Sequence, residues 1–188
     1  MRSAALMTII AATVLAAGAC TSTQTGQPSP TGQPTSGDPT SSPAASGLRD
    51  VKACALLNQS EAQRAVPGIG APEDQGEFAG SASSCRWTKS ATAGQGGFVV
   101  GIAVRPTQSI KDVAVTRPDE TLSNATTSGG RQAVVQRNGQ GQGSCAISIA
   151  VGSGRVDIDG QTLRGTTQDA CSVVSKVSDY AEPKLPAS

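Results

Sequence analysis

A sharp change of composition after residue 47 most constrains what this chain can fold into. Residues 21–47 are almost entirely Thr, Ser, Gly, Pro and Gln, with one charge, Asp38, and no large apolar residue. Such a segment cannot bury enough apolar surface to offset the entropy of ordering it, so we expect residues 20–47 to be a disordered tether. Residues 48–188 mix apolar and charged side chains. At about 140 residues, this part is long enough for one domain with one core.

Residues 1–19 have the pattern of a secretory signal peptide. A basic start, Met1-Arg2, precedes an uncharged and mostly apolar stretch over residues 4–19, which is short for a membrane-spanning helix. Residues 17–20, Ala-Gly-Ala-Cys, resemble the lipobox of bacterial lipoproteins, in which the cysteine is diacylated before cleavage. We expect lipidation at Cys20 and a protein held by its lipid on the extracytoplasmic side of the cell membrane. Ordinary secretion without a lipid is the alternative.

The composition excludes several classes of function. The chain has no histidine, which removes the commonest general base and the commonest ligand of catalytic zinc. Its net charge of +1 gives no field that would attract nucleic acid. Only four aromatic residues are present: Phe78, Trp87, Phe98 and Tyr180. We therefore expect no catalytic, cofactor-binding or metal-ligating residues and no nucleic-acid partner.

Apolar residues have helical spacing near both ends of the domain, and in the middle they alternate with polar residues as in strands. A short helix is predicted after Asn58, with Glu61 as its capping partner and Pro67 as its stop. A longer helix is predicted over residues 167–181, ended by Pro183. Alternation predicts strands over residues 85–88, 97–104, 133–137, 145–151 and 155–159, and a brief helix is expected over 109–115. We predict an α+β domain with the N- and C-terminal helices on one face of an antiparallel sheet of about five strands.

Four cysteines remain if Cys20 is acylated. An even number in an oxidising compartment predicts two disulfides, and four cysteines allow three connectivities. We favour Cys54 with Cys85 and Cys145 with Cys171, because each pairing ties a helix end to a nearby strand. A structural zinc site is the alternative, disfavoured because the chain has no CxxC motif and no histidine.

The surroundings of these cysteines resemble a known family. CALLNQSEAQ from Cys54, the Cys85-Arg86-Trp87 step, SCAISIAV from Ser144 and the Asp169-Ala-Cys171 sequence are similar to actinobacterial lipoproteins grouped as domain of unknown function 3558. The resemblance covers about residues 50–186 and implies an envelope lipoprotein with a tether and a disulfide-bearing domain. It implies no activity, and the Gly- and Gln-rich segment at 138–143 departs from the family pattern.

Several motifs suggest chemistry but have a simpler structural interpretation. Gly139–Gly143 is similar to a phosphate-binding loop, yet a strand rather than a helix follows it, so we expect a flexible hairpin loop. Asp157 and Asp159 begin like a calcium loop but lack its further ligands, and alternation predicts that they face outward on a solvated strand face. We expect Trp87 to pack in the core against the neighbouring disulfide. A carboxylate pair for acid–base chemistry could come from Glu73, Asp74, Glu77, Asp119 and Glu120.

Three functions are consistent with the sequence. The first, which we favour, is a non-enzymatic binding or scaffolding domain of the cell envelope. Its partner would be an envelope lipid or other apolar molecule held between the sheet and the helices, or another envelope protein. The second is a hydrolase of cell-wall carbohydrate that uses a pair of carboxylates. The third is a regulatory ectodomain that acts with a membrane protein.

Overall fold

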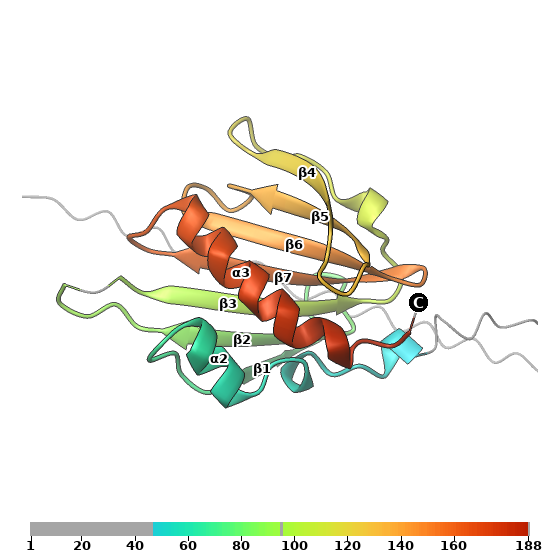
Figure 1. Cartoon of the computed structure of the whole chain (residues 1–188), viewed down its shortest axis with the longest axis horizontal. Helices are drawn as coiled ribbons and strands as arrows, with labels where there is room; N and C mark the ends of the chain where they lie inside the picture. Colours follow the sequence, from blue (N-terminus) through green and yellow to red (C-terminus); the bar gives the residue numbers. More distant parts are fainter. Residues whose placement is uncertain (1–46, 95, 188) are drawn as a thin grey trace, which may run out of the picture. The chain divides into compact units, whose positions relative to one another are not determined.

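Seven antiparallel strands form one sheet in the order β1-β2-β3-β7-β6-β5-β4 (Figure 1). The computed structural model describes residues 47–94 and 96–187, so the predicted signal peptide, Cys20 and all but the last residue of the predicted tether lie outside the described residues. The strands are β1 (Glu73–Gly76), β2 (Ser83–Lys89), β3 (Phe98–Arg105), β4 (Thr121–Thr126), β5 (Gln132–Arg137), β6 (Ser144–Val151) and β7 (Gly154–Thr162).

The sheet is built from two meanders joined at its centre. The first runs β1-β2-β3, and the second runs β4-β5-β6-β7, so that β7 returns to pair with β3. A two-residue turn, Gly152-Ser153, joins β6 to β7, and Val151 pairs with Gly154 across it. Within each meander, consecutive strands therefore pair as antiparallel hairpins.

The prediction of about five strands is wrong, because two edge strands carry no alternating pattern. In β1 all four residues are exposed, and in β4 only Leu122 and Ala125 are even partly buried. An edge strand with both faces in water needs no apolar face, so its sequence cannot be told from a loop. The five central strands follow the predicted ranges to within a few residues.

Short helices precede the sheet, and a longer helix follows it. They are η1 (Ala53–Ala55), α2 (Gln59–Ala65), α3 (Thr167–Ala181) and η3 (Glu182–Lys184), with η2 (Ile110–Asp112) between β3 and β4. The predicted capping box of α2 is present: the Asn58 side chain accepts from the Glu61 backbone N–H at 2.9 Å. The helix expected over residues 109–115 is reduced to the single turn η2.

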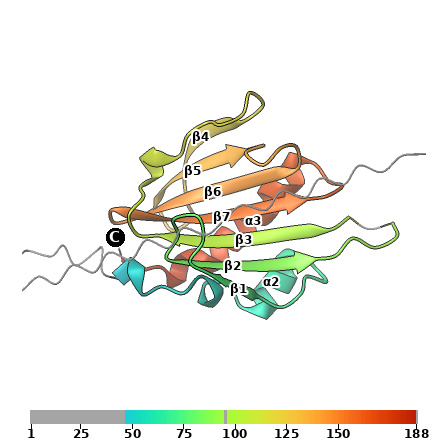
Figure 2. The same cartoon turned by 180° about the vertical axis from the view of Figure 1, so that it is seen from behind.

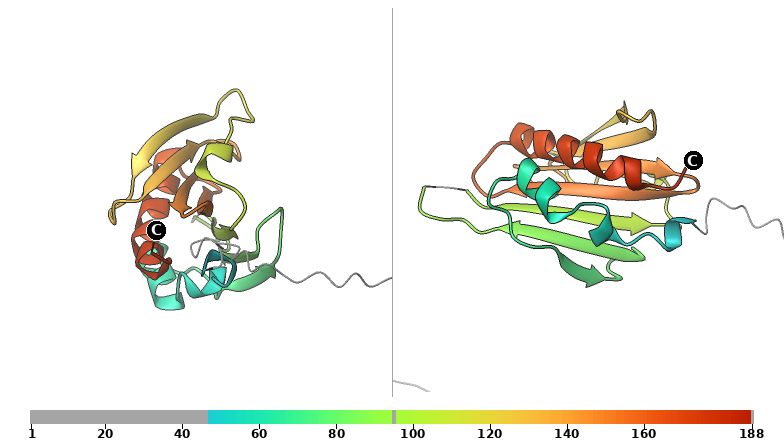
Figure 3. Two further views of the ribbon diagram at one scale, coloured as in Figure 1. Left: turned by 90° about the vertical axis from the view of Figure 1, so that its right-hand side faces the viewer. Right: turned by 60° about the horizontal axis from the view of Figure 1, so that its bottom comes forward.

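Helices α2 and α3 lie on the same face of the sheet (Figures 1 and 3). Helix α3 packs on β6 and β7, and α2 packs beside it. The helix comes close to the strand at Gly160, where an added Cβ would lie 2.9 Å from Val174 Cγ2 and 3.3 Å from the Phe98 ring. The lack of a side chain at residue 160 thus allows α3 to approach β7.

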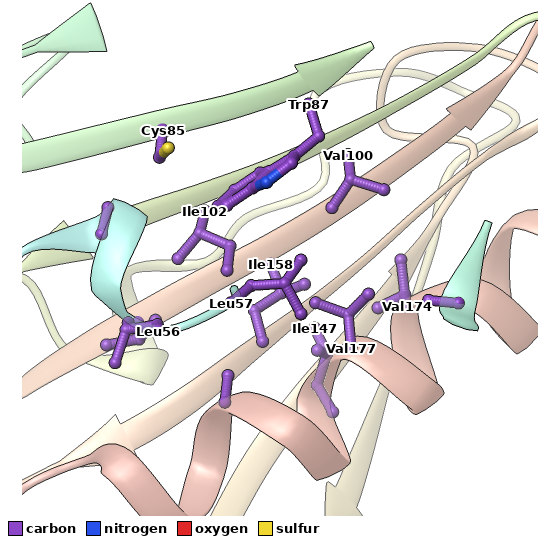
Figure 4. Packing of buried hydrophobic residues seen from close by; sticks show 14 of the residues in the cluster. Leu56, Leu57, Cys85, Trp87, Val100, Ile102, Ile147, Ile158, Val174 and Val177 are labelled. Atoms are coloured by element: carbon purple, nitrogen blue, oxygen red, sulfur yellow. The ribbon is translucent and has the colours of Figure 1, made fainter. Parts of the chain in front are cut away.

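The core lies between these helices and the sheet (Figure 4). Strand β3 shows the underlying alternation, with Phe98, Val100, Ile102 and Val104 buried and the residues between them partly exposed. Trp87 is 0% exposed and belongs to the same apolar cluster as Cys85, so it is a core residue. Leu57, Ile158 and Val177 belong to the same cluster and come from the segment before α2, from β7 and from α3 (Figure 4).

Two disulfides join the helical segments to the sheet, in the pairing favoured from the sequence. Cys54 bonds Cys85, with a Cα–Cα distance of 5.1 Å, and links the η1 region to β2. Cys145 bonds Cys171, with a Cα–Cα distance of 5.0 Å, and links β6 to α3. Within the described residues, no helix is long and apolar enough to cross a membrane.

Candidate functional site

The sheet face opposite the helices carries a trough that runs along β3. Figure 2 views this face, with α2 and α3 behind the sheet. The trough has a volume of about 530 Å³, within the range typical of ligand sites. It is lined by Gln75, Phe78, Ser84, Cys85, Arg86, Thr88, Val99, Gly101, Ile102, Ala103, Arg105, Gln140, Asp159 and Gln161.

Small side chains of β3 form the floor of the trough. The strand turns Val99, Gly101 and Ala103 outward, at alternate positions, while its neighbours carry longer polar residues. Pairing places Arg86 of β2 on one side of Gly101 and Asp159 of β7 on the other. Small residues on β3 thus lie between Arg86 of β2 and the longer polar residues of β7, and the face of the sheet is hollowed along β3.

The Asp159 carboxylate lies across the backbone of Gly101. A Cβ added to Gly101 would stand only 2.3 Å from Asp159 Oδ1, so the carboxylate occupies the space a side chain would need. Gly101 therefore sets the position of this group, which leans from β7 toward β2. Any larger residue at position 101 would displace it.

The surroundings of Asp159 raise its pKa. Burial is the largest cause, and the negative charge of nearby Asp157 adds to it. Arg86, a hydrogen bond from the Gln140 side chain and Arg105 act in the opposite direction but do not outweigh them. A carboxyl group with a raised pKa in a hollow of the surface is typical of a functional site.

Asp157, two residues earlier on the same face, has a structural role. It accepts hydrogen bonds from Arg105 Nε at 2.6 Å, from Arg155 Nε at 2.8 Å and from Ser148 Oγ at 2.7 Å. Arg105 also donates to the Ala79 carbonyl at 2.6 Å, and Arg155 donates to the Ser109 carbonyl at 2.7 Å. Asp157 thus orients two arginines that hold the β1–β2 and β3–β4 loops over the sheet.

The expected solvated face of β7 therefore requires correction. Val156 and Ile158 do point inward and are fully buried, and both aspartates point to the other face. However, the Asp157 side chain is only 18% exposed and Asp159 is half-buried. Side chains and loops from outside β7 cover them, and the alternation of a strand says nothing about such cover.

The carboxylates singled out from the sequence do not form a pair across the sheet. Glu73 and Asp74 lie in β1 and Glu77 follows it, whereas Asp119 and Glu120 precede β4. The two groups lie by opposite edges of a seven-stranded sheet, roughly 29 Å apart at the usual strand spacing. Glu120 accepts hydrogen bonds from Gln136 and from the Thr116 N–H and hydroxyl, and these bonds lower its pKa. Glu120 therefore holds the loop before β4 in place.

The Gly-rich segment forms a hairpin loop and contributes one residue to the trough. It connects β5 to β6, with Gly141 and Gly143 at positive φ, as a turn of this kind requires. Gln140 extends from it to Asp159. The sequence motifs did not predict this contact, nor the roles of Arg86 and Gly101. The one signal in the sequence was the run of polar residues at alternate positions of β7, from Arg155 to Gln161.

A second hollow lies on the helical face, between α3 and the β4–β5 half of the sheet. Its volume is about 620 Å³, and small apolar residues, hydroxyl groups and the Cys145–Cys171 disulfide line it. Two charged groups of its lining already have partners: Arg137 donates to Gln168 at 3.3 Å, and Asp179 accepts from the Ser128 hydroxyl at 2.8 Å. In the trough, by contrast, Arg86 and the Gln140 side chain act on the Asp159 carboxylate, so the trough is the better candidate.

The fold is an antiparallel sheet with helices on one face, two disulfides and a polar trough on the other. A family model matches this chain over residues 15–184, so the chain belongs to the family described as protein of unknown function (DUF3558). No curated protein and no solved structure shows a significant match to it.

Proposed function

We propose that the protein is an extracytoplasmic, lipid-anchored binding protein that acts without chemical turnover, with the trough along β3 as its ligand site. The trough carries this proposal, because it is a hollow of suitable volume in which Gln140 and Arg86 act on the Asp159 carboxylate, which lies over Gly101. The leader, Cys20 and the tether support a position outside the cell membrane. Two disulfides are consistent with an oxidising compartment.

A carboxylate-dependent hydrolase is the second candidate. It is favoured by one observation: Asp159, with its raised pKa, could act as an acid beside Asp157. The contacts of Asp157 weaken this candidate. Both of its oxygens already accept charged hydrogen bonds from arginines, which leaves it a poor base or nucleophile.

Mass spectrometry of the full-length protein, made in an actinobacterial host and gently extracted, tests the binding proposal. We expect the native spectrum to contain a non-covalent passenger that the denatured spectrum lacks. The variant Ala103→Tyr places a ring on the trough floor, on the side away from the core, and should lose that passenger. Ser172→Tyr is the matched control, since it adds the same ring to the hollow beside α3.

Two results would contradict the proposal. One is a wild-type protein without any passenger, and the other is a passenger that Ala103→Tyr retains as fully as Ser172→Tyr does. Turnover of the passenger by wild-type protein, lost in Asp159→Asn, would instead establish the hydrolase.

A further inference from the structure

An exposed aromatic ring stands at the rim of the trough. The Phe78 residue is 66% exposed, the most exposed large apolar residue in the described part of the chain. It lies in the loop between β1 and β2, which Figure 3 (left) shows projecting from the side of the sheet opposite the helices. Exposing a ring to water is unfavourable, so its place beside a polar hollow requires an explanation.

The turn that carries this ring is fixed in place. The buried Ser81 hydroxyl donates to the Phe78 carbonyl at 2.6 Å and lies 2.5 Å from the Ser84 hydroxyl on β2. Next in the chain, Ala79 has φ +48°, which is unusual for a residue with a side chain, and Arg105 binds its carbonyl. The ring is therefore presented by an ordered turn that is held at both of its sides.

The rest of the lining offers hydrogen bonds of both kinds and balanced charge. Three glutamines and two hydroxyl residues can each donate and accept, and Arg86 and Asp159 supply one charge of each sign. Arg105 also lines the trough, but it is paired with Asp157. A ligand with a strong net charge of either sign would meet an unfavourable group here, whereas hydroxyl groups find partners of both kinds.

The geometry disfavours a peptide added as a further strand. The floor strand β3 is paired along its whole length with β2 and β7, so its backbone has no free edge for another chain. Recognition must come from side chains alone. From Val99 to Arg105 the floor extends about 20 Å at the usual rise per residue, enough for several linked units.

We propose that the trough binds a neutral glycan, a chain of uncharged sugars lying along β3, with the apolar face of one sugar ring on Phe78. This inference rests on the proposed function and names the ligand class of the same site. The amide, hydroxyl and charged groups bind the sugar hydroxyls, and the aromatic ring contacts the C–H face of the sugar.

The test measures binding of defined sugars to the full-length lipoprotein in nanodiscs by saturation-transfer NMR. The probes are neutral tetrasaccharides of glucose, mannose, arabinofuranose and N-acetylglucosamine, with tetragalacturonate as the charged comparison. We expect at least one neutral probe to bind and tetragalacturonate to bind less tightly. Phe78→Ala should weaken binding roughly tenfold. Leu163→Ala is the matched control, because Leu163 is 62% exposed but does not line the trough.

Variants that remove a charge separate this inference from its alternatives. Asp159→Asn and Arg86→Gln each keep a hydrogen-bonding group but lose a charge, so both should weaken binding of a neutral glycan, and to a similar extent. A loss confined to one of the two variants would point to a cationic or an anionic ligand and overturn the inference. The inference would also be overturned if Phe78→Ala left binding unchanged or if none of the neutral probes bound. The mass-spectrometric test is independent: a passenger that is lost in Ala103→Tyr but is not a carbohydrate would refute the glycan and leave the binding protein standing.

Discussion

At the scale of single residues, Gly101 and Asp159 show how a missing side chain on one strand positions a charged group on the next. The carboxylate lies where a Cβ at residue 101 would be, and its burial there raises its pKa. Alternation placed Asp159 on the outer face correctly. It could not place the group over a neighbouring strand, because the β3–β7 register is a property of pairing between distant segments.

The raised pKa of Asp159 predicts a pH-dependent effect on stability. The folded state holds this proton more tightly than the unfolded chain does, so ionisation of Asp159 costs stability as pH rises from the ordinary value of 3.8 through the folded pKa. Asp159→Asn removes that cost. We expect the variant to melt at a higher temperature than wild type at pH 7, with the difference vanishing below pH 3.8.

Asp157→Asn is the control for that measurement. It removes the charge shared by Arg105 and Arg155 in a site that is mostly buried, so it should destabilise the protein at pH 7 by about 2 kcal/mol. Thermal melts from about pH 3 to about pH 8 check both variants across the range in which carboxyl groups titrate. An Asp159→Asn protein that is less stable than wild type at pH 7 would show that this carboxylate is a stabilising group.

At the scale of elements, the helices and strands that could be predicted from the sequence are those with an apolar stripe or a helix cap. The central strands and α3 have such stripes, and α2 has its capping box. The edge strands β1 and β4 have none and were missed. The trough was missed for a related reason, since its lining comes from separate strands and two loops.

Each disulfide ties a helical element to the sheet and predicts a measurable loss when it is removed. Cys145 and Cys171 are separated by 26 residues in the sequence, so the double variant Cys145→Ala/Cys171→Ala should lose about 3 to 4 kcal/mol of unfolding free energy in urea. The Cys54–Cys85 bond closes a similar loop, with a separation of 31, so Cys54→Ala/Cys85→Ala should lose nearly the same. A loss below about 1 kcal/mol in either variant would contradict this account.

At the scale of the whole molecule, contacts from the C-terminal segment join the β4–β5 hairpin to helix α2. Buried Glu182 accepts hydrogen bonds from Thr127 and from the Gly129 N–H at 2.9 Å. Burial alone would raise its pKa, but these bonds and the charge of Arg131 outweigh it and lower the pKa. Lys184 Nζ, a few residues on, lies 2.6 Å from Glu61 of α2. The end of the chain thus reaches both the β4–β5 hairpin and the first helix.

The proposed location predicts a change of compartment when the lipid is lost. The variant Cys20→Ala cannot be acylated, so we expect it in the culture medium or with its leader uncleaved, whereas the wild type remains with the membrane. Cell fractionation combined with the mass of the mature protein checks this. A Cys20→Ala protein that is processed and still bound to the membrane would disprove the lipid anchor.

The first and last described residues of the domain meet at one end of the sheet (Figure 1). A Cβ on Gly47 would lie 3.7 Å from Pro186, and Leu48, near the start of the described chain, is fully buried close to Gly154. A domain whose two ends lie close together tolerates insertion into another protein. The domain could therefore be inserted into a loop of a host protein without stretching the loop or the domain.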